Sequence, residues 1–264
     1  MAVAVGTTSA TLALGLFLGS GGWPGEPSGC IAVQDCYCEA FTGGIIEQPV
    51  NTLSNFGFVL VGLWILWRTS RDRRPAIRSR MGQEPVYGLL YGAIGVFIGI
   101  GSMYFHASMK EWGGWIDLLS MHLFITYLLL YDVAVVRRRT TVWFLRSFAI
   151  ANVVLGIVLW IMDNGYGKFV FGALIVLTLV AEYRLARPDA PVMRERRWFW
   201  AGLAVYGIGQ VIWLLSRDGA PLCDPDSLLQ GHALWHLTSA AAVFLVYRYL
   251  TSERQRAPSV GEDL

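Results

Sequence analysis

Seven apolar stretches, each about as long as a lipid bilayer is thick, recur along the chain and restrict its fold more than any other feature. A membrane-spanning helix needs about 17–25 predominantly apolar residues. The stretches lie at residues 52–67, 86–106, 116–136, 141–161, 168–186, 198–216 and 231–250. The chain is 55% hydrophobic and only 15% charged, whereas a soluble domain carries about 25% charged residues. We therefore expect an all-α integral membrane protein, a seven-transmembrane helix bundle spanning residues 52–250.

The basic residues are concentrated in alternate connections between these stretches. Of the 21 Lys and Arg residues, 17 lie in the last turn of, or after, the first, third, fifth and seventh stretches. Because Lys and Arg accumulate on the cytoplasmic side of a membrane, the segment before the first stretch should face outward. The tail at 251–264 should then be cytoplasmic. Nearly all the basic residues are Arg, which is typical of GC-rich bacterial genomes and favours a bacterial inner membrane. The net charge of +2 gives no indication of a nucleic-acid partner.

Residues 1–22 form a further apolar segment that is rich in Gly, Ala, Thr and Ser and has no basic region before it. Three interpretations stay open: an extra membrane span, a weak signal peptide, or a helix lying on the membrane surface. Residues 23–51 follow as an outward-facing segment that contains three of the four cysteines.

The four cysteines, Cys30, Cys36, Cys38 and Cys223, all fall in segments predicted to face outward. Disulfides form in such oxidising compartments. A bond between Cys36 and Cys38 would strain so short a loop, so Cys223 should pair with a cysteine of the N-terminal segment. Cys38 and Cys223 are the candidate pair. Free thiols or a second metal site are the alternatives.

Ionisable side chains inside membrane spans are costly and are therefore functional candidates. His106 ends the second stretch, Asp117 begins the third, and His232 and His236 begin the seventh. Residues four apart share one helical face, so His232 and His236 form half of a zinc site. A third His from a neighbouring helix would complete the ligand set and leave the fourth position for water, which is the arrangement of catalytic zinc.

Ser102 lies one helical turn before His106, only about 5–10 Å below the outer helix end. All of these groups therefore share one membrane depth, which scattered His residues would not do. The pattern at 232–236 lacks the Glu of the His-Glu-x-x-His peptidase helix, and Asp117 would supply the carboxylate from another helix. Ser102 has an alternative role, a bond to the carbonyl four residues back. His122 lies off the helical face of Asp117, and we expect it to serve in packing or to support the site residues from behind.

Four glycines of the second stretch, Gly88, Gly92, Gly95 and Gly99, follow the small-xxx-small pattern of closely packed membrane helices. They should let this helix approach its neighbours and help to bring His106 within reach of the seventh stretch.

The motifs resemble the alkaline ceramidase family, part of a superfamily of seven-span metal hydrolases that includes the adiponectin receptors. The resemblance is carried by Gly-x-Gly-Ser-x-x-Phe-His at 99–106, Asp117, His-Ala-x-Trp-His at 232–236, and Asn-Thr-Leu-Ser-Asn at 51–55. Gln230, Gly231 and Cys223 also fit the family pattern. The resemblance runs from Asp35 to the end of the seventh stretch and points to a bacterial member.

The resemblance implies a zinc ion held by His106, His232 and His236, with Ser102 and Asp117 as catalytic residues beside it. It also implies that the substrate is ceramide or a related N-acyl lipid, cleaved to a fatty acid and a long-chain amine. Family members additionally bind calcium through acidic residues before the first span. Asp35, Glu39 and Glu47 are the available residues here, although their spacing departs from the family pattern.

Two other functional classes fit a seven-span protein with buried His and Asp. One is a receptor-like protein with a structural zinc, although such a site needs neither Ser102 nor Asp117. The other is a proton-coupled transporter that uses Asp117 and the His residues as a relay. Transporters are often built from inverted repeats, and this sequence has no such repeat.

Overall fold

The computed structural model describes residues 1–32, 36–71, 79–161 and 164–256, and all seven predicted stretches are helical in it. The long helices after the N-terminal one are α4 (Phe56–Arg71), α6 (Pro85–Ser108), α7 (Glu111–Val136), α8 (Thr141–Ile161), α9 (Asn164–Leu185), α10 (Arg196–Leu215) and α11 (Gly231–Thr251). The short helices are α2 (Gly29–Ala32), α3 (Pro49–Ser54) and α5 (Arg80–Gln83). The strands β1 (Val192–Met193) and β2 (Arg254–Gln255) form one small antiparallel pair. The prediction of an all-α fold is confirmed.

Within the described residues, six helices are long and apolar enough to cross a membrane. They are α1 (Ala2–Gly19), the α3–α4 unit at Pro49–Arg71, α6, α7, α8 and α10. The helices α9 and α11 are not among these six, and α11 carries two His residues. The chain is thus a multi-pass membrane protein, with helices at two further predicted stretches.

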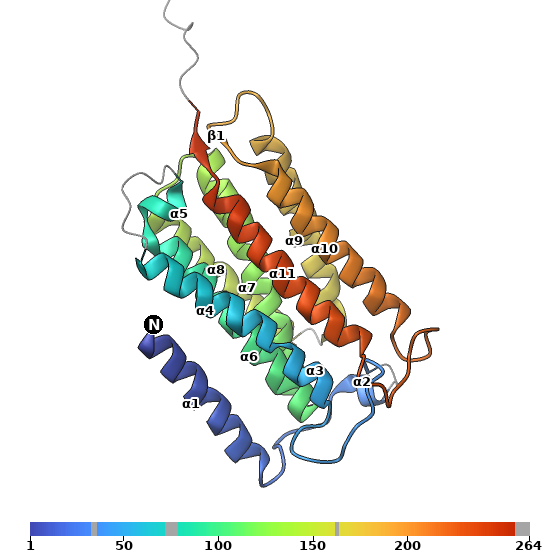
Figure 1. Cartoon of the computed structure of the whole chain (residues 1–264). Helices are drawn as coiled ribbons and strands as arrows, with labels where there is room; N and C mark the ends of the chain where they lie inside the picture. Colours follow the sequence, from blue (N-terminus) through green and yellow to red (C-terminus); the bar gives the residue numbers. More distant parts are fainter. Residues whose placement is uncertain (33–35, 72–78, 162–163, 257–264) are drawn as a thin grey trace, which may run out of the picture.

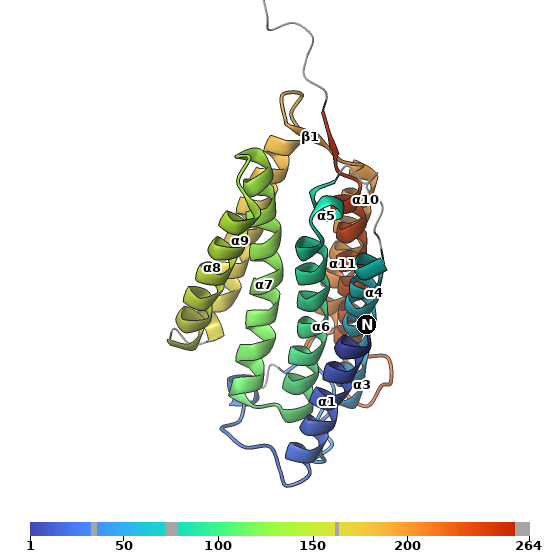
Figure 2. The ribbon, with the colours of Figure 1, turned by 90° about the vertical axis from the view of Figure 1, so that its left-hand side faces the viewer.

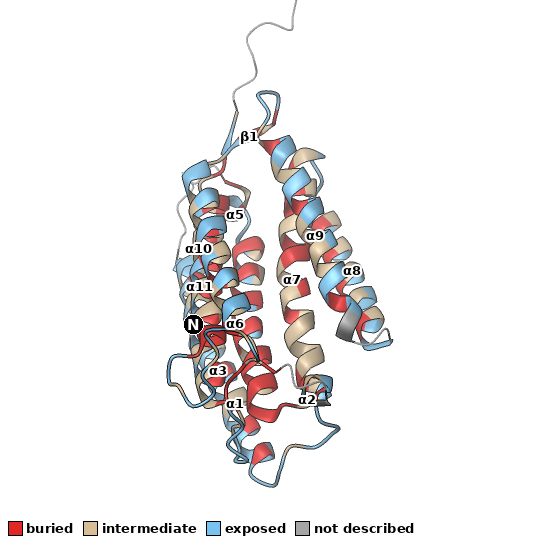
Figure 3. Cartoon of the chain, turned by 90° about the vertical axis from the view of Figure 1, so that its right-hand side faces the viewer, coloured by how far each residue is buried: buried red, intermediate tan, exposed pale blue. Residues whose placement is uncertain are grey.

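The long helices run side by side along one common direction (Figures 1 and 2). Helix α6 packs against α4 and α7, α7 packs against α8 and α9, and α11 packs against α10 and α4. We call the end that holds α2, α3 and the start of α11 the histidine end. The opposite end, with α5 and β1, is called the arginine end. Buried residues face the interior of the bundle, and exposed residues face outward (Figure 3).

Helices α4 and α6 approach closely because glycines line their contact. A Cβ added to Gly62 would lie 2.5 Å from the backbone nitrogen of Val96, and one added to Gly99 would lie 2.9 Å from the carbonyl oxygen of Asn55. Both distances are too short for any side chain. The glycine pattern predicted for close packing therefore does bring α6 against a neighbour, and that neighbour is the α3–α4 unit.

Helix α1 lies along the outside of the bundle beside α6 (Figures 1 and 2). Its attachment depends on Tyr104, whose hydroxyl donates to the carbonyl of Thr11 over 2.5 Å. Gly15 leaves room for this ring, because a Cβ there would lie 2.6 Å from it. Of the three interpretations of residues 1–22, this position along the bundle agrees with the extra span.

A buried ionic cluster closes the arginine end of the bundle. Arg194 pairs with Asp132 of α7 at 2.7 Å, with Glu182 of α9 at 3.0 Å and with Glu253 at 2.8 Å. The Arg194 side chain is only 2% exposed. Since buried charges persist in proteins only when they are paired, this cluster holds α7, α9 and the end of α11 together. This cluster was not expected from the sequence.

Candidate metal centre and lipid cavity

Three histidines from two helices meet at the histidine end of the bundle. His106 lies in the last turn of α6, and His232 and His236 lie in the first turns of α11. Each offers a ring nitrogen, and these atoms all lie within 4.8 Å of one another. The Nε2 atoms of His106 and His232 are 3.1 Å apart, and all three side chains are buried. The structure therefore brings together the three residues that the sequence selects as metal ligands.

The amide of Gln48 fixes the orientation of His106. Its Nε2 donates to the carbonyls of Cys36 at 3.3 Å and Glu39 at 3.1 Å. Its Oε1 consequently faces the imidazole, 2.8 Å from Nδ1 of His106. An oxygen can only accept there, so Nδ1 carries the proton and Nε2 keeps its lone pair. This is the tautomer that a metal-binding imidazole requires.

Ser54 of α3 contacts His236. Its hydroxyl donates to the carbonyl of Asn51 at 2.8 Å and lies 2.7 Å from Nδ1 of His236. With its single hydrogen on Asn51, Ser54 offers an acceptor to Nδ1, while the amide nitrogen of Asn55, a donor, lies 3.3 Å from the same atom. The Nε2 atom of His106 is thus prepared as a ligand, and Ser54 can support the same tautomer of His236. The donor set of three imidazoles in one buried cluster fits zinc.

Ser102 and Asp117 complete the site. Ser102 is one turn before His106 on α6, and its Oγ lies 3.5 Å from Nε2 of His236. Asp117, near the start of α7, lines the same cavity as Ser102 and His236. The two-residue connection of Met109 and Lys110 between α6 and α7 holds these helix ends together. Both of the predicted catalytic residues therefore lie beside the histidines.

An apolar cavity of about 200 Å³ leads away from this site into the bundle. Ser102, Asp117 and His236 lie at one end of it, and α11 lines it as far as Val246. From His236 to Val246 is about 15 Å along the helix at 1.5 Å per residue. The rest of the lining comes from α4, α6, α7, α9 and α10 and is almost wholly apolar, with residues such as Phe58, Ile98, Met121, Phe124, Ile125, Leu128, Phe171, Ile175 and Phe199. This lining suits hydrocarbon chains.

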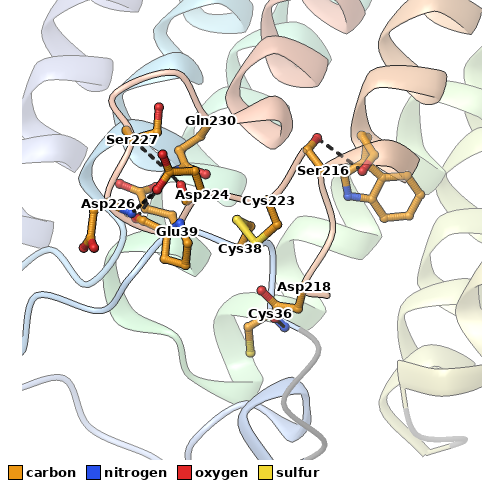
Figure 4. The surroundings of a disulfide bond; sticks show 12 residues. Cys36, Cys38, Glu39, Ser216, Asp218, Cys223, Asp224, Asp226, Ser227 and Gln230 are labelled. Atoms are coloured by element: carbon orange, nitrogen blue, oxygen red, sulfur yellow. Dashed lines mark hydrogen bonds between the residues drawn. A yellow bond between two sulfur atoms is a disulfide. The ribbon is translucent and has the colours of Figure 1, made fainter. Parts of the chain in front are cut away.

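The segment before α3 closes the site from the histidine end and is fastened by disulfides. Cys38 bonds to Cys223, as predicted, and Cys30 bonds to Cys36, a pairing that the sequence analysis did not identify. All four cysteines are thus oxidised, so neither the free-thiol nor the metal-ligand alternative applies. Figure 4 shows the Cys38–Cys223 bridge and the carboxylate of Asp218, which accepts the backbone N–H of Cys36.

Tyr37, between the two disulfides, lies against the histidines. Its ring centroid is 4.2 Å from that of His232 and 4.9 Å from that of His106. The residue has a φ of 52°, an uncommon left-handed conformation for a non-glycine residue. Tyr37 belongs to the segment that the two disulfides fasten. Its ring shields the histidine cluster from the histidine end.

Two of the three residues suggested for calcium have other contacts, and Asp35 lies outside the described residues. The carboxylate of Glu39 accepts the backbone N–H groups of Val50 at 2.6 Å and Asn51 at 2.7 Å and so caps the start of α3. Burial raises the pKa of Glu39, and the two N–H bonds oppose this effect. Glu47 accepts the N–H of Gly43 at 3.1 Å. Calcium binding stays a prediction.

His122 lies outside the site. Its Nδ1 bonds to the carbonyl of Leu118 at 2.8 Å, and its ring packs 5.4 Å from that of Phe171. It therefore serves in packing, as its position off the face of Asp117 indicates. Gln48, Ser54 and Tyr37 were not identified as site residues from the sequence. The only signal for them was the position of Ser54 within the Asn-Thr-Leu-Ser-Asn motif at 51–55.

Comparison with known proteins identifies one family. The family described as Ceramidase matches residues 37–259, which include the three histidines, Ser102 and Asp117. No curated protein sequence matches the chain.

Proposed function

The protein belongs to the ceramidase family, and from this premise we propose that it is a zinc-dependent amidase of membrane lipids. It would hydrolyse the N-acyl amide bond of ceramide, or of a related lipid, to a fatty acid and a long-chain amine. One observation carries the proposal: the buried histidine cluster, Ser102 and Asp117 lie at the end of an apolar cavity. A polar cluster that only stabilised the fold would not need such a cavity.

Three residues would hold the metal, and two would handle protons. Zinc held by His106, His232 and His236 would supply a Lewis acid that polarises the amide carbonyl and acidifies water. Asp117 takes a proton from the attacking water molecule as the oxygen of that water bonds to the carbonyl carbon of the substrate. It then delivers that proton to the amide nitrogen as the C–N bond breaks. The Ser102 hydroxyl stabilises the negative charge that develops on the carbonyl oxygen.

The remaining residues of the site position these groups and exclude water. Gln48 holds the imidazole of His106 in the metal-binding tautomer, and Ser54 can support the same tautomer of His236. The aromatic ring of Tyr37 covers the cluster from the histidine end. The cavity receives the acyl and amine chains, which would reach it laterally from the bilayer.

We further propose that the histidine end faces outward and the arginine end faces the cytoplasm. The predicted positions of the basic connections support this orientation. Both disulfides lie at the histidine end, and disulfides form outside the cytoplasm. In a bacterium the protein would lie in the inner membrane with its site towards the periplasm.

Metal analysis combined with hydrolysis of labelled ceramide by the purified protein in detergent tests the proposal. The wild type should bind about one zinc per chain and release fatty acid. His232→Ala should lose both zinc and hydrolysis, whereas Asp117→Asn should keep the metal and lose hydrolysis. His122→Ala is the matched control, because this buried imidazole lies outside the cluster and its removal should leave the zinc content unchanged.

Full turnover in His232→Ala or Asp117→Asn would contradict the mechanism. A wild-type protein that binds zinc without cleaving any N-acyl lipid would instead favour the receptor-like alternative. A wild-type protein that neither binds zinc nor hydrolyses any N-acyl lipid would favour the transporter.

A further inference from the structure

One hydroxyl group in the wall of the apolar cavity has no hydrogen-bond partner. Ser239 lies on α11 and lines the cavity. The residue is 7% exposed, and its Oγ is buried without a partner. A buried hydroxyl without a partner costs free energy, so its presence in a wall that is otherwise almost wholly apolar requires an explanation.

The other hydroxyls of the membrane helices show that a local partner is usual. Thr178, which lines the same cavity from α9, donates to the carbonyl of Leu174 at 2.8 Å. Thr238, the neighbour of Ser239, donates to the carbonyl of Leu234 at 2.9 Å. Such bonds to the preceding turn are the ordinary way in which Ser and Thr are satisfied in a helix. Ser239 departs from this pattern, and it does so at a position that lines the cavity.

The position of Ser239 relative to the site limits what that ligand is. Ser239 follows His236 by three residues, so the two side chains are neighbours on one helical face. Along the helix axis Ser239 lies only about 4.5 Å deeper than the histidine. A substrate whose amide carbonyl lies at the histidine cluster therefore presents to Ser239 an atom a few bonds from that carbonyl. Further along, the wall takes only hydrocarbon.

We propose that Ser239 binds a hydroxyl group of the lipid substrate close to the scissile amide, an inference that rests on the proposed function. Ser239 would thus select hydroxylated N-acyl lipids over simple fatty-acid amides. The hydroxyl that it recognises belongs either to the long-chain amine, near its nitrogen, or to the carbon next to the acyl carbonyl. The two sources share one chemistry and can be separated with substrates that lack one hydroxyl each.

The test compares Ser239→Ala with the wild type on ceramide, on 1-deoxyceramide, on 3-deoxyceramide and on a 2-hydroxyacyl ceramide. Ser239→Ala should lower kcat/KM for the substrate that carries the recognised hydroxyl about five- to tenfold, the effect of one neutral hydrogen bond. The same substitution should leave kcat/KM unchanged for the analogue that lacks this hydroxyl. Thr178→Val is the matched control, since it removes from the same cavity a hydroxyl that is already bonded within its helix.

A loss in Ser239→Ala that is equal for all four substrates, or no loss for any, would overturn the assignment while leaving the proposed function intact. An equal effect of Thr178→Val would overturn it as well. If the wild type hydrolyses none of the four amides, the proposed function is wrong, and the assignment of Ser239 falls with it.

Discussion

Gln48→Leu tests whether the contacts around the histidine cluster prepare it for a metal. Gln48 is 0% exposed, and its Oε1 is the acceptor, at 2.8 Å, for the Nδ1 proton of His106. Leu fills a similar volume but accepts no proton. Loss of such an outer partner of a ligating His lowers metal affinity roughly 10–100-fold, which equals about 1.4–2.8 kcal/mol. We expect the zinc Kd of Gln48→Leu to rise by this factor.

The assay is a competition titration of the purified protein with a chromophoric zinc chelator. Gln48→Leu also removes two bonds to the carbonyls of Cys36 and Glu39, which would cost about 2 kcal/mol of folding stability. Gln230→Leu is the matched control: Gln230 is buried and donates to carbonyls of its own loop, and no bond joins its amide to an imidazole. Gln48→Glu retains an acceptor for His106 and should retain zinc.

Wild-type zinc affinity in Gln48→Leu would refute the reasoning, because the tautomer of His106 would then not depend on this contact. An equal loss in Gln230→Leu would also refute it, since the effect would come from the fold of the outer segments.

Three further predictions concern stability, measured by thermal unfolding in detergent. Breaking the Cys38–Cys223 bridge by Cys38→Ser should cost about 2–5 kcal/mol. Breaking the Cys30–Cys36 bridge, which closes a much shorter loop, should cost less. Equal losses would contradict the dependence on loop length. Arg194→Met removes the cation from the buried carboxylates of Asp132 and Glu253 and the partly buried one of Glu182, and it should destabilise the protein by about 3–5 kcal/mol. An unchanged midpoint would show that the cluster is not ionised. Because burial raises the folded-state pKa of Glu39 above about 4.3, the folded state binds the extra proton. The wild type should therefore lose stability relative to Glu39→Gln as the pH rises from about 4.3 through the folded-state pKa of Glu39. The opposite trend would mean that the N–H bonds of Val50 and Asn51 outweigh the effect of burial on this pKa.

The membrane helices could be predicted because a bilayer imposes a length and an apolar composition on each of them. The break between α3 and α4 at Asn55 could not, since the break depends on contacts with α6 and α11 that are distant in the sequence. The extent of the glycine pattern on α6 correctly indicated close packing. It did not indicate which neighbour the glycines would meet, because several helices could have filled that place.

The histidine cluster was predictable because the spacing of His232 and His236 places them on one helical face, and His106 shares their depth. Gln48 and Tyr37 carried no such signal, since each reaches the cluster through the disulfide-fastened segment and not through a periodic pattern. Arg194 was counted only as a basic residue of a connection. The carboxylate of Asp132 within an apolar stretch was the available signal for a buried partner, and it was not used.

The separation of the site residues along the chain affects how the protein is made. His106 and His232 lie 126 residues apart, and the Cys38–Cys223 bridge joins residues 185 positions apart. During synthesis, the first ligand and its positioning residue Gln48 are inserted long before the last helix leaves the ribosome. The histidine cluster cannot form until α11 has entered the bundle, and this disulfide cannot form until the connection before α11 has been made. If the proposed function holds, a nascent chain, or one truncated before α11, should therefore be inactive towards the lipids of the membrane in which it is being assembled.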